Sequence, residues 1–314
     1  MRIVLLENLG CSPELVEENA ARLRALGHEF TACQRTTDMA RLMAESRDAD
    51  VLMLANMPLP AEVLAQAPDV KFIDVAFTGV DHIPVADARS RGIAISNASG
   101  YADESVAELC ISFMIQLLRH LPEAERRCRE GGTKAGLGAN LLQGKTVGLV
   151  GAGAIGKRLA ALCKAFGCTV LAHNRRPVSD PAIDENVSLD ELLRRSDIVS
   201  LHCPLTPETR GMIGAPELAK MKKSAFLINT ARGPVVDNAA LAAALDAGEI
   251  AGAACDVFDM EPPLPADSPL LRCKNAIVTP HLAFYSQESL EERARIAFAN
   301  LFAWLEGRQI NRIE

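Results

Sequence analysis

Arg232, Glu261 and His281 are three residues that could together handle a small organic acid. Arg232 lies in Ala231-Arg232-Gly233-Pro234, and His281 follows Thr279-Pro280. A guanidinium holds a carboxylate through two parallel hydrogen bonds and polarises a neighbouring carbonyl. An imidazole gives or takes a proton near neutral pH. A carboxylate such as Glu261, placed beside His281, would make the imidazole more basic and set its tautomer.

Each of these residues also has an ordinary structural interpretation. Arg232 could form a surface salt bridge, although the Gly233-Pro234 turn after an apolar run favours a functional role. A lone histidine is more often structural than catalytic, and an acidic residue before two prolines is often exposed to solvent. Spacing alone leaves these alternatives open for His281 and Glu261.

A glycine pattern upstream predicts a hydride carrier for such chemistry. Gly151, Gly153 and Gly156 lie between the apolar run Thr146–Val150 and a helical pattern over Lys157–Phe166. Strand, glycine turn and helix in this order are typical of dinucleotide binding. The first glycine permits the turn, the second admits the pyrophosphate, and the third allows close helix packing. The start of the helix presents free N–H groups to phosphate.

The residues after the next predicted strand bear on the form of the dinucleotide. In NAD sites an acidic residue about 20 positions beyond the glycines binds the ribose 2′-hydroxyl. Here Asn174, Arg175 and Arg176 occupy that region, and the next acid is Asp180. A guanidinium can bind a 2′-phosphate that a carboxylate would repel, so we favour NADP(H). The alternative is NAD(H), with Asn174 on the ribose and both arginines merely solvated.

Composition limits the class of protein. The chain has 314 residues, a net charge of −7 and 49% hydrophobic residues, which predicts two domains with substantial cores. A net negative charge argues against binding to nucleic acid or to an anionic membrane, since both would repel the chain. The nine cysteines are scattered without metal-ligand spacing, so we expect no metal site. We interpret them as buried, reduced thiols of a cytoplasmic protein.

Short apolar runs alternate with helical patterns, which predicts an α/β protein with two doubly wound parallel sheets. We expect strands at 3–6, 29–32, 51–54, 72–75, 93–96, 147–150, 170–172, 198–202, 226–229, 253–257 and 277–279. We expect helices at 13–26, 37–44, 105–121, 238–247 and about 286–306, and a glycine-rich connector at 131–138. The helix 105–121 has almost no polar face, so we expect it to be buried all round, either between domains or at a subunit interface.

Five motifs in order extend over nearly the whole chain: 151–156, His-Cys-Pro-Leu-Thr-Pro-Glu-Thr at 202–209, 229–237, 256–263 and Thr-Pro-His at 279–281. With these motifs the chain resembles the D-isomer-specific 2-hydroxyacid dehydrogenases. The resemblance implies that Arg232, Glu261 and His281 are the catalytic residues. It also implies a Rossmann cofactor domain, residues 99–286, inserted into a flavodoxin-like substrate domain, residues 1–98 plus 287–314.

The resemblance further implies the ligand contacts and the assembly. The cofactor would meet the glycine turn and the loops after the strands, through Gly151, Gly153, Ala154, Ile155, Gly156, Asn174, Arg175, Arg176, His202, Cys203, Pro204, Thr209, Thr230, Ala231, Arg232, Asp256, His281 and Ala283. Asp256 would face the nicotinamide carboxamide. The substrate would meet Phe77, Thr78, Gly79, Arg232, His281 and Tyr285, with its carboxylate on the backbone N–H groups of the loop 77–79. Members are usually homodimers built on the apolar helix.

Three stretches depart from the common family pattern. Leu282-Ala283-Phe284-Tyr285 after the histidine resembles the branch that contains the C-terminal-binding-protein corepressors. Phe77 stands where a small residue is common. Asn174-Arg175-Arg176 resembles NADPH-using glyoxylate and hydroxypyruvate reductases. We therefore expect a reductase of small 2-keto acids that uses NADPH. The alternative is a nucleotide-sensing, corepressor-like binding protein with little turnover.

Overall fold

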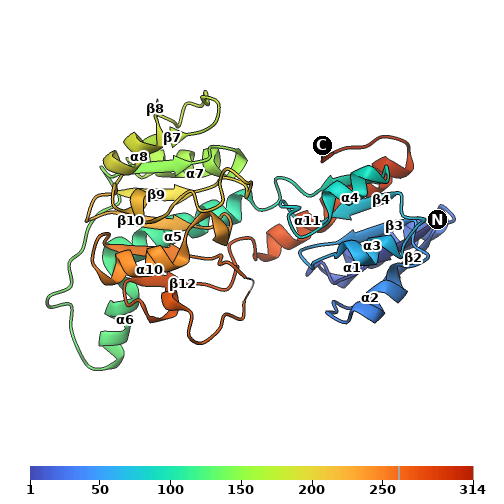
Figure 1. Cartoon of the computed structure of the whole chain (residues 1–314), viewed down its shortest axis with the longest axis horizontal. Helices are drawn as coiled ribbons and strands as arrows, with labels where there is room; N and C mark the ends of the chain where they lie inside the picture. The colour runs from blue at the N-terminus through green and yellow to red at the C-terminus, as the bar shows by residue number, and fades with distance from the viewer. Residues whose placement is uncertain (261, 314) are drawn as a thin grey trace. The chain divides into compact units, whose positions relative to one another are not determined.

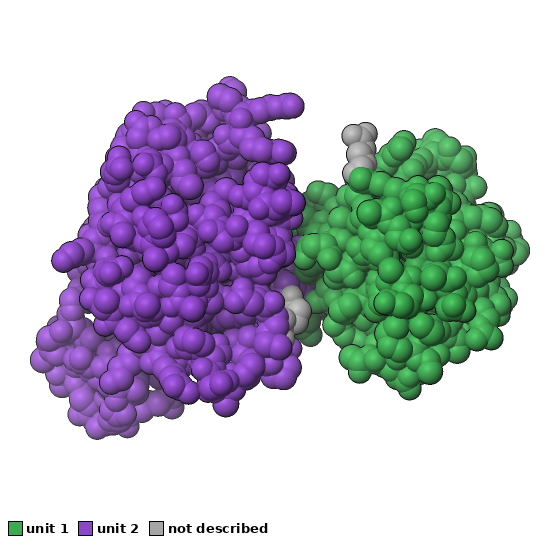
Figure 2. Space-filling model, viewed as in Figure 1, with its two compact units in different colours: residues 1–102, 285–314 green, residues 103–284 purple. Residues whose placement is uncertain are grey.

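The computed structural model describes residues 1–260 and 262–313. The chain forms two compact units, residues 1–102 with 285–314, and residues 103–284 (Figures 1 and 2). Both units are α/β structures built on parallel sheets, as the alternating pattern predicted.

The first unit is a five-stranded sheet with strand order β2-β1-β3-β4-β5 and every neighbouring pair parallel. This is the flavodoxin-like order. Its strands are β1 (Arg2–Leu5), β2 (Glu29–Ala32), β3 (Val51–Leu54), β4 (Phe72–Val75) and β5 (Ala94–Asn97). Its helices are α1 (Pro13–Ala25), α2 (Met39–Ser46), α3 (Ala61–Ala65), α4 (Val85–Ser90) and α11 (Gln287–Leu305).

The C-terminal helix α11 belongs to the core of this first unit although it lies far away in sequence. Phe298 and Leu301 are buried together with Ile3 and Phe72 of the sheet. Trp304 stacks on Phe72 with ring centroids 4.9 Å apart. Burial of these large apolar side chains against the sheet fixes the return of the chain to the first unit.

The second unit is a seven-stranded parallel sheet with order β12-β11-β10-β9-β6-β7-β8. Its strands are β6 (Thr146–Val150), β7 (Thr169–His173), β8 (Glu185–Asn186), β9 (Ile198–Leu201), β10 (Phe226–Asn229), β11 (Gly252–Cys255) and β12 (Ala276–Val278). Its helices are α5 (Asp103–Arg119), α6 (Leu121–Arg129), α7 (Ala154–Ala165), α8 (Leu189–Arg195), α9 (Ala215–Leu218) and α10 (Asn238–Asp246), with short 3-10 turns at Gly233–Val235 and Pro269–Arg272. The order is that of a Rossmann sheet extended by one strand.

One long helix is present as expected, but it begins and ends two residues earlier than the expected range 105–121. Helix α5 ends at Arg119, His120 takes a left-handed φ of 49°, and α6 follows. Pro122 explains the break, because its ring would clash with the Leu118 carbonyl in a continuing helix. The N–H of Asn140 donates to that carbonyl instead, at 2.9 Å.

Within one copy of the chain this helix is not buried all round. One face of α5 packs on α7 and on strands β10 and β11. Leu109 and Ile115 are only half-buried, and Glu108 is exposed. Figure 1 shows α6 and the connector after it lying away from the sheet of the second unit.

The cysteines are free thiols, but they are not all buried as expected. Cys128 is exposed and Cys11, Cys33 and Cys203 are half-buried, whereas the other five are buried. Within residues 1–260 and 262–313, no His, Cys, Asp and Glu side chains gather as a set of three or more metal ligands. No helix in the same ranges combines the length and apolar character needed to span a bilayer.

Candidate active site at the carboxyl edge of the second unit

Parallel pairing places the residues after each strand of the second unit along one edge of the sheet. The strand order reverses between β6 and β9, where chains leave the sheet toward opposite sides. Ligands of open α/β sheets bind outside the carboxyl ends at such a reversal. The glycine turn follows β6, and the residues after β9, β10, β11 and β12 continue along the same edge.

Two of the three glycines in the turn are required by the fold. Gly151 has a φ of 94°, and a Cβ there would lie 2.7 Å from the backbone of His202 and Cys203. A Cβ at Gly156 would lie 2.5 Å from the carbonyl oxygen of Gly151. These contacts bring the loops after β6 and β9 together and pack α7 tightly against the turn.

Gly153 differs, because a Cβ there would meet no atom of the described residues within 4 Å. It is the N-cap residue of α7 and no side chain caps that helix. The first N–H groups of the helix, which include those of Ala154 and Ile155, therefore have no partner within it. An open glycine before an uncapped helix N-terminus fits a pyrophosphate.

A pocket of about 570 Å³ adjoins this turn and is lined by Ala152, Gly153, Ala154, Lys157, Pro177, Val178 and Ser179. It lies between the start of α7 and the segment after β7. Sequence reasoning missed Lys157 here. Its position in the first turn of α7, directly after Gly156, was the available signal, because that turn faces any bound phosphate.

Asn174 supports the glycine turn from the end of β7. Its Oδ1 accepts a hydrogen bond from the Ala152 N–H at 2.8 Å. Arg175 and Arg176 are both exposed. A hydrogen bond from Thr206 lowers the pKa of Glu208, and the positive charge of Arg175 adds to this. Arg175 therefore acts electrostatically on the loop after β9, across the reversal of strand order.

The loop after β9 is held by its own polar groups. Thr209 Oγ1 donates to the Pro204 carbonyl at 2.7 Å and accepts from the Thr206 N–H at 2.8 Å. His202 Nε2 shares a hydrogen bond of 2.8 Å with the Ser200 hydroxyl. Burial lowers the pKa of His202 to about 4, so this imidazole is neutral at physiological pH. Burial also raises the pKa of the Cys203 thiol, which makes it a poor nucleophile.

Arg232 follows β10 in a turn that fits closely against the neighbouring loop. A Cβ on Gly233 would lie 1.7 Å from the Phe258 carbonyl oxygen, so only glycine fits there. The Asn229 side chain receives the Ala231 N–H and donates to the Arg232 carbonyl. The half-buried Arg232 therefore lies in a hydrogen-bonded turn. This turn contacts the segment after Asp256 through Gly233 and Phe258.

Asp256 organises the loop that carries His281. Its carboxylate, fully buried, accepts hydrogen bonds from the Thr279 hydroxyl at 2.6 Å and from the N–H groups of Leu282 and Ala283 at 2.9 and 2.8 Å. Its carbonyl accepts the His281 N–H at 2.8 Å. Burial raises the pKa of the Asp256 carboxyl, and these hydrogen bonds oppose that effect.

His281 is held in an uncommon conformation by this network. Its φ is 55°, in the left-handed region, and its ring meets Phe284 edge-on at 5.3 Å. Such strain persists only where the surroundings enforce it, and it concentrates at functional sites. β11 lies between β10 and β12, so Arg232 and His281 flank the residues that follow β11.

Thr230 and Glu261 are the other two residues predicted to contribute to this edge. The Thr230 hydroxyl lies 3.3 Å from the Cys110 thiol of α5, which holds it at the end of β10. Glu261, the predicted carboxylate partner of His281, lies outside the described residues.

The predicted substrate loop belongs to the first unit and follows β4. The Phe77 side chain is buried against His82 and Tyr101. Among the described residues, the backbone N–H groups of Thr78, Gly79 and Val80 donate to no other group. Thr78 Oγ1 is buried and makes no hydrogen bond to them either. Consecutive N–H groups with a free hydroxyl suit a carboxylate. Tyr285, also in the first unit, is 68% exposed.

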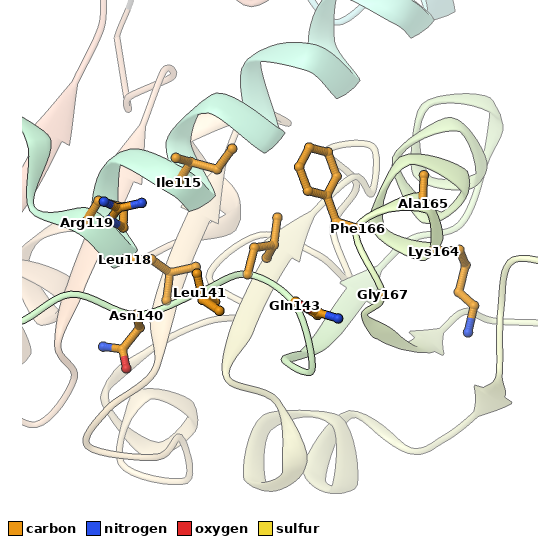
Figure 3. Close-up of a pocket in the computed structure, with 11 residues that line it drawn as sticks. Ile115, Leu118, Arg119, Asn140, Leu141, Gln143, Lys164, Ala165, Phe166 and Gly167 are labelled. Carbon is orange, nitrogen blue, oxygen red and sulfur yellow. The ribbon is translucent and has the colours of Figure 1, made fainter.

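A second pocket of about 530 Å³ lies at the opposite, amino edge of the second sheet. Figure 3 shows that its lining comes from the end of α5, the segment 140–143 and the end of α7. Leu141 and Phe166 at this pocket are largely exposed apolar side chains. The glycine turn and the loops of Arg232 and His281 do not contribute to it.

Comparison with known proteins identifies the family. The family model described as D-isomer specific 2-hydroxyacid dehydrogenase, NAD binding domain, matches residues 111–283. The chain belongs to the D-isomer-specific 2-hydroxyacid dehydrogenases. As a member of this family it is an oxidoreductase that uses a nicotinamide dinucleotide, and the family match spans the glycine turn, Arg232 and His281.

Individual relatives of this dehydrogenase agree with the family. It is 34% identical over 324 residues to a hydroxypyruvate reductase of Blautia hydrogenotrophica, covering 99% of both chains. It is 41% identical over 276 residues to a glyoxylate reductase of Thermofilum pendens, covering 85% of this chain and 81% of the relative. A crystal structure of a glyoxylate reductase from Paecilomyes thermophila superposes with a TM-score of 0.90 at 28% identity, covering 100% and 98% of the two chains.

Proposed function

We propose that this dehydrogenase reduces a small 2-keto acid to the D-2-hydroxy acid with NADPH. The observation that carries the proposal is the arrangement around β11, where the Asp256 network holds the His281 loop and the Gly233 turn presents Arg232 at the same edge as the uncapped helix N-terminus. A cationic fork and an imidazole beside a dinucleotide site suit reduction of a keto acid.

The residues have separate roles in this proposal. NADPH, when bound, supplies the hydride for the carbonyl carbon. Arg232 binds the substrate and polarises its carbonyl oxygen, and His281 donates the proton that this oxygen takes up. Glu261 sets the tautomer of the His281 imidazole in this proposal. The N–H groups of Thr78 and Gly79 bind the substrate carboxylate.

Several features support NADPH over NADH. No acid follows β7 where a ribose 2′-hydroxyl would be bound, and Asn174 already uses its Oδ1 on the glycine turn. Arg175 and Arg176 are exposed, and Lys157 lines the pocket beside Gly153. Arg175 and Arg176 directly precede Pro177, which also lines this pocket, and cationic side chains in this region suit a 2′-phosphate.

We also propose a cytoplasmic homodimer. The free thiols support a reducing compartment. The face of α5 that carries the half-buried Leu109 and Ile115 offers apolar surface for a second copy, and the exposed Leu121, Leu141 and Phe166 add to it. Sedimentation at several concentrations tests the dimer, and a monomer at micromolar concentration would contradict it.

One assay panel tests the function. Glyoxylate, hydroxypyruvate, pyruvate, phenylpyruvate and a branched 2-keto acid are each incubated with NADPH or NADH, and each product except glycolate, which is achiral, is resolved on a chiral column. We expect turnover, a lower KM for NADPH than for NADH, and the D isomer. Tight NADPH binding without turnover on any keto acid would instead favour a nucleotide-sensing protein.

A further inference from the structure

Glu7, Arg35 and Asn56 form a polar cluster at the carboxyl edge of the first unit's sheet, which the proposed reaction does not use. Glu7 follows β1, Arg35 lies after β2, and Asn56 follows β3. In this flavodoxin-like order the strand sequence reverses between β1 and β3. The cluster therefore lies where such a sheet binds ligands.

The buried Glu7 carboxylate holds the backbone after β3 at this edge. Its side chain is only 4% exposed. Oε1 accepts the N–H groups of Ala55 and Met57 at 2.8 and 2.7 Å, so it holds the backbone on both sides of Asn56. Removal of a carboxylate from water is costly unless its oxygens are bonded in this way.

Arg35 is held by the two other members of the cluster. Its Nη1 donates to Glu7 Oε2 at 2.8 Å and to Asn56 Oδ1 at 2.9 Å. Both hydrogen bonds to described residues use this one nitrogen, and the side chain is 48% exposed. The ion pair with Glu7 thus uses only Nη1 of the guanidinium, and the Nε and Nη2 donors can bind a further acceptor.

The cluster lies next to the predicted substrate loop within the same unit. Leu54 of β3 pairs with Val75 of β4 at the ends of these two neighbouring parallel strands, so Asn56 and the loop 77–79 follow them at the same edge of the sheet. Neighbouring strands are about 5 Å apart. A keto acid with its carboxylate on the N–H groups of Thr78 and Gly79 would have its C3 substituent at this same edge of the sheet.

We propose that Arg35, held by Glu7 and Asn56, is a specificity residue that binds a hydroxyl or anionic substituent at C3 of the 2-keto acid. The inference rests on the proposed function and adds the substrate class. It favours hydroxypyruvate over pyruvate, since these two acids differ only by the C3 hydroxyl.

Arg35→Gln tests the assignment through the ratio of kcat/KM for hydroxypyruvate to that for pyruvate. Loss of a hydrogen bond from a charged donor should lower this ratio by about 10- to 100-fold, with pyruvate reduction little changed. Arg47→Gln removes another exposed arginine of the same unit and should leave the ratio unchanged. Arg35→Lys is the second variant, used if Arg35→Gln folds poorly. It keeps a charge beside Glu7 without the guanidinium fork and should lower the ratio by a smaller factor.

The outcomes separate this inference from the proposed function. A wild-type enzyme that reduces no 2-keto acid removes the proposed function itself. A wild-type enzyme that reduces both acids, with a ratio unchanged in Arg35→Gln and Arg35→Lys, overturns only the role of Arg35. An equal fall in kcat/KM for both acids also overturns it, because Arg35 would then support the fold or the common binding mode.

Discussion

Replacement of Gly153 by alanine separates what the fold requires at the glycine turn from what a dinucleotide requires. A Cβ at Gly153 would meet no described atom within 4 Å, and its φ is −74°, which alanine adopts readily. The free energy of unfolding should therefore change by less than about 1 kcal/mol. If a pyrophosphate lies over this residue, the added methyl must push it away from the α7 N-terminus.

Loss of one N–H hydrogen bond to a phosphate oxygen costs about 1.5–3 kcal/mol. The Kd for NADPH should therefore rise by about 10- to 150-fold in Gly153→Ala. Binding is followed by NADPH fluorescence in a titration, and stability by urea unfolding. Gly151→Ala is the matched variant, because its Cβ would lie 2.7 Å from the His202 backbone at a φ of 94°.

Gly151→Ala should instead lose about 2 kcal/mol or more of stability, through backbone strain and displacement of the neighbouring loop. We thus expect opposite results for the two variants. Gly153→Ala should be stable but bind NADPH weakly, whereas Gly151→Ala should lose stability. Wild-type affinity for NADPH in a stable Gly153→Ala variant would refute the placement of the pyrophosphate.

Three other substitutions probe the rest of the edge. Arg232→Lys keeps the charge but loses the fork, so kcat/KM for the keto acid should fall by about 10-fold or more; an unchanged KM and kcat would remove Arg232 from substrate binding. Asp256→Asn places an amide donor among the Thr279, Leu282 and Ala283 donors, so kcat should fall by about 10-fold or more while NADPH still binds; an unaltered kcat would show that His281 needs no such support. His202 has a pKa of about 4 when folded against 6.5 when unfolded, so the unfolded chain takes up the proton first on acidification. Between pH 7 and pH 5 the wild type should lose about 2 kcal/mol more unfolding free energy than His202→Gln, and equal losses in urea titrations would contradict this.

The sequence predicted the fold well where apolar runs are buried on both faces. Val51–Leu54 and Phe226–Asn229 form strands with the expected bounds because every side chain is buried. The sequence did not predict α6, which buries no residue and so has no apolar stripe to reveal it. The break at His120 follows from Pro122, a local signal outweighed by the long apolar pattern.

The candidate site was predictable where a single motif carries the geometry, and less so where distant segments meet. The glycine turn and Arg232 lie at the expected strand ends. The reach of Glu7 to Ala55 and Met57 depends on β1 and β3 being neighbours, which no local pattern encodes. The close approach of Gly233 to Phe258 likewise appears only after the sheet has assembled.

The most direct test of the account is the kcat of His281→Ala for hydroxypyruvate at saturating NADPH. If His281 supplies the proton, kcat should fall by about 100- to 10,000-fold while the Kd for NADPH stays within about twofold of wild type. Turnover at the wild-type rate by a variant that still binds NADPH would contradict the proposed role of His281, and with it the chemistry assigned to this edge.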